Sequence, residues 1–166
     1  VRLITMDKGA TLHEPNVGYR IKTGSNGLSY LGLGKAIDGL KLGLAGAHQQ
    51  SNAAVAISLV LAMGLRDSGL SVGEGAIREG LANARHPGRL EWVGDSILID
   101  GAHNVESATA LANYIQRLDA PEGFTLLLGA SSDKNVRSIA TTLAPYVSAV
   151  ITTRCSHPRA MEPGDV

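Results

Sequence analysis

The stretch ILIDGAHN, residues 97–104, joins an apolar strand to a polar loop. Its three branched apolar side chains are typical of a buried strand. The run stops at Asp100, and His103 follows after two small residues, Gly101 and Ala102. Carboxylate and imidazole groups are costly to bury without partners. We therefore predict that Asp100 and His103 lie at the carboxyl end of a strand, where a slim loop lets a ligand approach the backbone.

The chain from Pro87 onward alternates strands and helices around this stretch. Apolar patterning and the Gly94-Asp95 turn predict strands at 89–93, 96–100, 124–129 and 148–153, and helices at 105–118 and 136–143. This alternation is typical of an α/β domain with a parallel sheet, whose ligands bind at the carboxyl ends of the strands. Polar loops follow three of the strands, at 100–104, 129–135 and 153–160. We expect these loops to open on one edge of the sheet.

The first 86 residues follow a different pattern. Their apolar runs predict a strand at 1–6 and three antiparallel strands at 17–23, 28–33 and 37–45. From His48 to about residue 65 nearly every side of the predicted helix is apolar, which favours a buried helix. Ser71 and Glu74 have the spacing of a capping box, which predicts a second helix ending near Asn83. Pro87 and Gly88 then mark a domain boundary, since proline cannot continue a helix.

Composition excludes several functional classes. The 166 residues carry 15 basic and 15 acidic side chains, which gives no electrostatic case for nucleic acid or an anionic membrane. A hydrophobic fraction of 44% against 18% charged residues favours a packed core. The single cysteine, Cys155, fits a reducing cytosol. The chain starts inside an apparent strand without methionine, so we expect a piece of a longer protein.

Polar residues at the predicted strand ends are candidates for chemistry. Asp100 and His103 could alternatively form only a turn and a surface histidine beside the helix cap Asn104, but their spacing and location favour function. Arg89 suits a phosphate, which guanidinium binds through two hydrogen bonds, or else a surface ion pair. Asn52, with Gln49, offers amides that suit a nucleobase edge or the first turn of a helix.

Two further loops supply candidates for carboxylate binding. Lys134 and Arg159 offer cations and Ser156 a hydroxyl, although each could be a solvated loop residue. Pro158 restricts the chain before Arg159, which favours that arginine. No cluster of residues has the spacing of a metal site.

Three blocks of sequence, taken in order, resemble one known family. GAHQQSNAAVAI at 46–57, HPGRLEWV at 86–93 with ILIDGAHN, and DK at 133–134 with HPRA at 157–160 are similar to the folylpolyglutamate synthase and dihydrofolate synthase group of the Mur ligase superfamily. The resemblance implies an α/β fold: residues 1–86 would be the C-terminal part of a P-loop-type central, ATP-binding domain. Residues 87–166 would be most of a Rossmann-like C-terminal domain with a mostly parallel sheet.

The resemblance also implies roles for the matched residues. Asn52 would contact adenine, Arg89 an ATP phosphate, and Asp100 the ribose or the linker. His103 would be catalytic and lie near the reacting phosphate and the incoming glutamate. Arg159 would hold a glutamate carboxylate, with Lys134 and Ser156 as further substrate-binding candidates.

The family reaction is ATP-dependent formation of an amide through an acyl phosphate. Its substrates are a folate or dihydropteroate and L-glutamate, and its cofactors are ATP and Mg²⁺. No stretch of this chain matches the family's P-loop, magnesium ligands or modified lysine, so we expect these residues alone to be inactive. The resemblance implies a cytoplasmic monomer. The alternatives are a cell-wall or cyanophycin type of amino-acid ligase, and a non-catalytic nucleotide-binding module.

Overall fold

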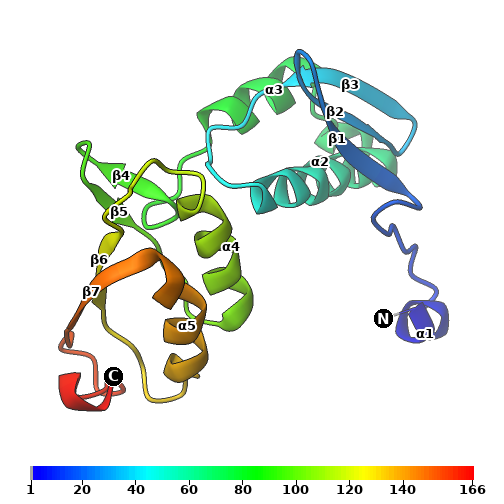
Figure 1. Ribbon diagram of the computed structural model, residues 1–166. Coiled ribbons are helices and arrows are strands. Elements are labelled where there is room, and N and C mark those ends of the chain that lie inside the picture. Colours follow the sequence, from blue (N-terminus) through cyan, green and yellow to red (C-terminus); the bar gives the residue numbers. More distant parts are fainter. Residues whose placement is uncertain (1) are drawn as a thin grey trace. The chain divides into compact units, whose positions relative to one another are not determined.

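The backbone divides between His86 and Pro87 in the computed structural model, which describes residues 2–166 (Figure 1). Unit 1 comprises Val1–His86 and unit 2 comprises Pro87–Val166. Gly88 follows the boundary with a φ of +70°, a left-handed conformation that glycine adopts without strain.

Unit 1 is built on a three-stranded antiparallel sheet in the order β1-β2-β3. The strands are β1 (Tyr19–Gly24), β2 (Gly27–Gly32) and β3 (Lys35–Leu40), and the helices are α1 (Arg2–Asp7), α2 (His48–Arg66), α3 (Glu74–Asn83) and the short 3-10 helix η1 (Ser68–Leu70). Helix α2 contacts β1 and β2, and α3 contacts β3. The three predicted hairpin strands and both predicted helices are confirmed, with end points shifted by a few residues.

The core of unit 1 lies between this sheet and its two long helices. Tyr30, Ile37, Leu40 and Ile57 are each at most 2% exposed. One prediction about α2 is wrong: the helix is buried on one side only. Val55, Leu59 and Met63, spaced one turn apart, are 52%, 60% and 43% exposed, and they line an open pocket with the loop at residues 8–13.

Two local predictions in unit 1 are also wrong. Residues 2–7 form the helix α1 rather than part of a strand at 1–6, and Val1 lies outside the described residues. The segment makes local backbone hydrogen bonds, such as that from Lys8 N to Ile4 O at 3.1 Å, because no strand of the described chain pairs with it. Ser71 does not cap α3 either: the N-cap is Gly73, without a side-chain hydrogen bond.

Unit 2 contains an antiparallel hairpin and a separate parallel pair of strands. Its elements are β4 (Glu91–Val93), β5 (Ile97–Ile99), α4 (Val105–Ile115), β6 (Phe124–Leu128), α5 (Val136–Leu143), η2 (Ala144–Tyr146), β7 (Val147–Thr152) and η3 (Pro163–Asp165). β4 pairs with β5, and β6 pairs in parallel with β7. The predicted elements are confirmed, but the parallel sheet has two strands: within the described chain, the three-residue β5 pairs with β4 alone. The prediction that 97–99 form a buried strand is therefore wrong: Ile97 and Ile99 are 57% and 44% exposed.

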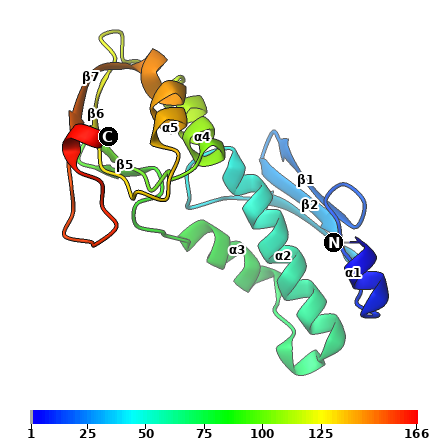
Figure 2. The ribbon, with the colours of Figure 1, turned by 90° about the horizontal axis from the view of Figure 1, so that it is seen from below.

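Helices α4 and α5 pack against each other on one side of the β6–β7 pair (Figure 2). Ala108 and Ala112 of α4, which are 0% and 5% exposed, let the two backbones approach closely, and Ile139 of α5 fills the contact. Asn104 begins α4 with a capping box, as its Oδ1 accepts a hydrogen bond from Ser107 N at 2.8 Å. This confirms the predicted cap and fixes the backbone that follows the DGAH turn.

Candidate active site

Asp100 lies at the end of β5 and ties two segments together. Its Oδ2 accepts a hydrogen bond from Leu90 N at 2.9 Å, and the next residue, Gly101, donates its N–H to Gly88 O at 2.7 Å. The carboxylate is half-buried, and its other oxygen remains available to a ligand. The end of β5 is therefore joined to the first residues of unit 2.

His103 is exposed in the turn before α4, and its ring is oriented by one hydrogen bond. Its Nδ1 lies 2.8 Å from Gly101 O. A carbonyl oxygen only accepts, so Nδ1 carries the proton in this contact and Nε2 is left to face a ligand. The backbone N–H of His103 donates to Ser107 Oγ at 3.0 Å, which fixes the main chain below the ring.

The loop after β6 and the loop after β7 meet through their backbones. Ser132 N donates to Arg159 O and Met161 N to Ala130 O, both at 2.9 Å, and Ser131 forms an isolated antiparallel bridge with Ala160. This pairing holds two exposed loops in register. It brings together candidates that are about 25 residues apart in the sequence, Lys134 and Arg159.

Asp133 links these two cations. Its Oδ2 lies 3.0 Å from Lys134 Nζ and its Oδ1 lies 3.9 Å from Arg159 Nη1. The hydrogen bond with Lys134 and the nearby charges hold the pKa of the Asp133 carboxyl below its usual range. All three side chains are more than a third exposed, so an incoming carboxylate can reach both cations.

A cavity of about 340 Å³ at the carboxyl ends of β5, β6 and β7 gathers part of the predicted set. Asp100, His103 and Lys134 line it, together with Ser131 and Cys155. The predicted residues Arg89, Ser156 and Arg159 are not among its lining residues. Arg159 reaches the cluster through Asp133, Arg89 lies half-buried between Gly88 and Leu90, and Ser156 is exposed on the loop after β7.

Asn52 belongs to unit 1, near the start of α2. It is exposed, and its Nδ2 donates to Oε1 of the buried Gln49 at 2.9 Å. The Gln49 Nε2 lies 3.0 Å from His48 Nε2. The first turn of α2 thus presents a chain of three hydrogen-bonded side chains, and the free oxygen of Asn52 can accept from a ligand.

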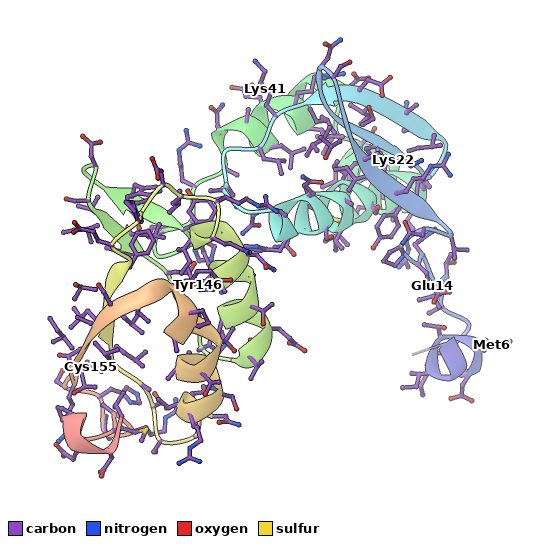
Figure 3. The ribbon with its side chains drawn as sticks, in the orientation of Figure 1. Met6, Glu14, Lys22, Lys41, Tyr146 and Cys155 are labelled. Atoms are coloured by element: carbon purple, nitrogen blue, oxygen red, sulfur yellow. The ribbon has the colours of Figure 1, made fainter. Side chains whose placement is uncertain are left out.

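Sequence reasoning missed three residues of this region. Cys155 was not among the predicted site residues, yet it lies on the loop after β7 (Figure 3) and lines the cavity. Asp133 bridges its neighbour Lys134 to Arg159 on the other loop, and Glu91 accepts a hydrogen bond from Gly88 N, three residues earlier. The adjacency of Asp133 to Lys134 was the one indication in the sequence.

The described residues do not form a metal site of their own. Among residues 2–166, no group of three or more His, Cys, Asp or Glu side chains could hold a metal ion. In the same part of the chain, no helix is long and apolar enough to cross a lipid bilayer. The monomeric state, the cytoplasmic location and the lack of a nucleic-acid partner stay predictions.

Comparison with known proteins identifies the class of domain to which unit 2 is similar. Residues 88–166 match the family described as Mur ligase, glutamate ligase domain. The dihydrofolate synthase/folylpolyglutamate synthase of Mycobacterium tuberculosis is 34% identical over 148 residues, which cover 86% of this chain and 30% of that protein. The unit whose strand ends carry Asp100 and His103 is therefore a Mur-type ligase domain.

Two solved structures extend the match to the whole chain. E. coli FolC in complex with DHPP and ADP has a TM-score of 0.83 at 28% identity, covering 99% of this chain and 38% of that one. A bifunctional folylpolyglutamate synthase/dihydrofolate synthase with Mn, AMPPNP and L-glutamate bound has a TM-score of 0.80 at 25% identity, covering 98% and 38%. The chain is thus similar along nearly its whole length to folylpolyglutamate synthase/dihydrofolate synthases, and its residues 88–166 match the glutamate ligase domain of Mur ligases.

These matches confirm the resemblance and the α/β class inferred from the sequence. The chain spans 30% to 38% of the length of these relatives. Of the cofactors expected, nucleotide and a divalent metal are present in the solved relatives.

Proposed function

We propose that the intact protein is an ATP-dependent ligase that joins L-glutamate to a folate or dihydropteroate carboxylate. The cavity that gathers Asp100, His103 and Lys134, inside the segment that matches a glutamate ligase domain, carries this proposal. The ligands named for the solved relatives, ADP, DHPP, AMPPNP and L-glutamate, support it. Residues 1–86 would supply the end of the central domain and residues 87–166 the C-terminal domain.

In the first step, a carboxylate oxygen of the pterin substrate attacks the γ-phosphorus of ATP. The bond from that phosphorus to the β,γ-bridging oxygen breaks, ADP leaves, and an acyl phosphate remains. Negative charge spreads over the transferring group, and cations held near it lower the barrier. Arg89 would contact the phosphates through its guanidinium, Asn52 the adenine and Asp100 the ribose.

In the second step, the glutamate amine attacks the acyl carbon and inorganic phosphate leaves. The amine must lose a proton before it can attack, and His103 Nε2 is oriented to accept one because Nδ1 is held by Gly101 O. Lys134 and Arg159 would bind the glutamate carboxylates, with Ser156 as a further hydrogen-bond donor. Asp133 holds both cations close to one point before the substrate arrives.

A divalent metal is present in one solved relative. The described residues offer no cluster that fits such an ion. We therefore assign no step of the reaction to a metal held by this chain.

The test is glutamate transfer by the purified intact protein. With ATP and radiolabelled glutamate, we expect label to enter tetrahydrofolate or dihydropteroate and not a muramyl precursor. Transfer to the muramyl precursor would instead identify a cell-wall type of ligase, and nucleotide binding without any transfer would identify a non-catalytic module.

A second arm uses the 166-residue chain by itself. We expect no turnover from it, because no stretch of it matches a P-loop. Turnover by this chain alone would show that residues 1–166 suffice for the reaction and would overturn the expectation that they are inactive.

A further inference from the structure

The backbone on either side of Arg89 is held by three hydrogen bonds. Gly88 N donates to Glu91 Oε2 at 2.7 Å, and Gly88 O accepts from Gly101 N at 2.7 Å. On the other side, Leu90 N donates to Asp100 Oδ2 at 2.9 Å. Two of the three bonds have a carboxylate as acceptor, and charge-assisted bonds are stronger than neutral ones. We call residues 88–90 the arginine arm.

Both neighbours of Arg89 have left-handed backbone conformations. Gly88 has φ +70° and Leu90 has φ +46°. Glycine accepts such an angle readily, but a bulky residue such as leucine does so only when its surroundings hold it there. Leu90 is 5% exposed, and its N–H is bound by Asp100, so packing and the hydrogen bond together hold the arm in this shape.

The guanidinium of Arg89 is left without a carboxylate partner. Two carboxylates lie close in sequence or space, Glu91 and Asp100, and both bind backbone N–H groups of the arm instead. Among residues 2–166, the structure gives Arg89 no ion pair, although the residue is half-buried. A half-buried cation on a fixed backbone is preorganised to bind an anion from outside the chain, because less conformational freedom is lost when the anion binds.

We propose that Glu91 is a positioning residue that acts through Arg89. By holding Gly88 N it fixes one end of the arginine arm, while Asp100 and Leu90 fix the other, and the arm presents the guanidinium to a nucleotide phosphate. The inference rests on the proposed function for the role of Arg89. It adds that Glu91 contributes to nucleotide affinity without touching the nucleotide.

A double-mutant cycle in the intact protein tests this. Glu91→Ala removes the bond to Gly88 N, so the dissociation constant and KM for ATP should rise about 5- to 20-fold, because part of the free energy of one charge-assisted hydrogen bond is lost to ATP binding. Glu91→Gln keeps an acceptor and should restore most of the affinity. In the Arg89→Ala background, Glu91→Ala should change ATP affinity less than about twofold, because the residue it positions is gone.

Matched controls separate positioning from folding. Glu122→Ala removes an exposed carboxylate elsewhere in unit 2 and should leave ATP affinity unchanged. Circular dichroism melts of each variant show whether unit 2 stays folded. An equal effect of Glu91→Ala with and without Arg89 would overturn the proposal, as would a Glu91→Ala variant with wild-type affinity.

The same cycle distinguishes this inference from the proposed function. If the intact protein binds ATP but transfers no glutamate, the proposed ligase activity fails while non-additivity of the ATP dissociation constants still supports the role of Glu91. If Arg89→Ala leaves ATP binding unchanged, the arginine arm does not bind the nucleotide. The inference is then overturned, whether or not the protein is a ligase.

Discussion

Units 1 and 2 use their buried residues for different purposes. Unit 1 encloses four large side chains almost completely, Tyr30, Ile37, Leu40 and Ile57, between its sheet and helices. Unit 2 has a smaller core, in which Ala108 and Ala112 lie between two helices, and its candidate catalytic side chains stand on loops. These loops are held by backbone hydrogen bonds and by helix caps, not by the packing of large side chains.

This difference predicts which substitutions should lower the stability of each unit and which should lower activity. Loss of buried volume should affect the stability of unit 1 most, since cores have few voids and relax only in part. In unit 2, loss of an exposed loop side chain should affect chemistry while the fold persists. Trp92 is the only tryptophan among the 166 residues and lies in β4, so the fluorescence of this 166-residue chain reports on unit 2.

The largest effect is expected from His103→Ala in the intact protein. Loss of a general base lowers turnover by about 10²- to 10⁴-fold. Because His103 is exposed, the thermal melt of unit 2 should not change. His13→Ala, an exposed histidine of unit 1, is the control and should keep wild-type turnover. An unfolded His103→Ala variant would show that this histidine is structural.

Next in size is Ile57→Ala, which removes a side chain 2% exposed in the core of unit 1. We expect a loss of about 2–5 kcal/mol in the free energy of unfolding, from lost burial and the cavity left behind. Urea titration should show the change by circular dichroism but not by Trp92 fluorescence. Val55→Ala, on the 52% exposed side of the same helix, should have little effect. Equal shifts in both probes would contradict independent units.

A smaller effect is expected at the start of α4. Asn104→Ala removes the side chain that accepts from Ser107 N, and losing such a cap lowers stability by about 1 kcal/mol. Trp92 fluorescence in urea measures it. The control Asn113→Ala alters an exposed asparagine within the same helix and should change stability by less than about 0.5 kcal/mol.

The smallest effect concerns alkaline pH and unit 1. Burial raises the pKa of the Tyr30 phenol, outweighing the hydrogen bond with Ser58, which lowers it. The folded chain therefore keeps this proton to higher pH than the unfolded chain does. The stabilising contribution is complete below a pH of about 10, the unfolded pKa, and is lost as pH rises through the folded pKa.

Tyr30→Phe should flatten that dependence. Urea denaturation followed by circular dichroism, repeated from neutral pH to above the unfolded pKa, measures it. Tyr146→Phe removes a phenol from unit 2 and is the control. Parallel pH profiles for wild type and Tyr30→Phe would mean that another group governs alkaline unfolding.

The sequence predicted the elements that have strong local patterns. The α5 helix at 136–143 and the β4–β5 hairpin around Gly94 follow from periodicity and turn chemistry, and tertiary contacts do not alter them. Residues 1–6 were wrongly predicted because a strand needs a partner, which apolar content alone cannot reveal. Ser71 has the spacing of a cap, but the chain enters α3 two residues later, at Gly73.

The sequence identified several residues of the candidate site, but it did not show which of them contact one another. Strand ends identified Asp100, His103 and Lys134, and these share a cavity, as expected for the carboxyl edge of a sheet. The contact of Asp133 with Arg159 depends on how two loops about 25 residues apart in sequence come together, which no local pattern encodes. Glu91 binds the N–H of Gly88, three residues earlier, and this contact depends on the backbone conformation of the turn.

In the proposed reaction the intact protein activates a carboxylate with ATP and then joins it to glutamate. The most direct measurement uses a folate labelled with ¹⁸O in the reacting carboxylate and follows the label through one round of glutamate transfer. An acyl phosphate requires one labelled oxygen to leave with inorganic phosphate, so we expect labelled phosphate together with ADP. Label in AMP, or glutamate transfer with unlabelled phosphate, would contradict it.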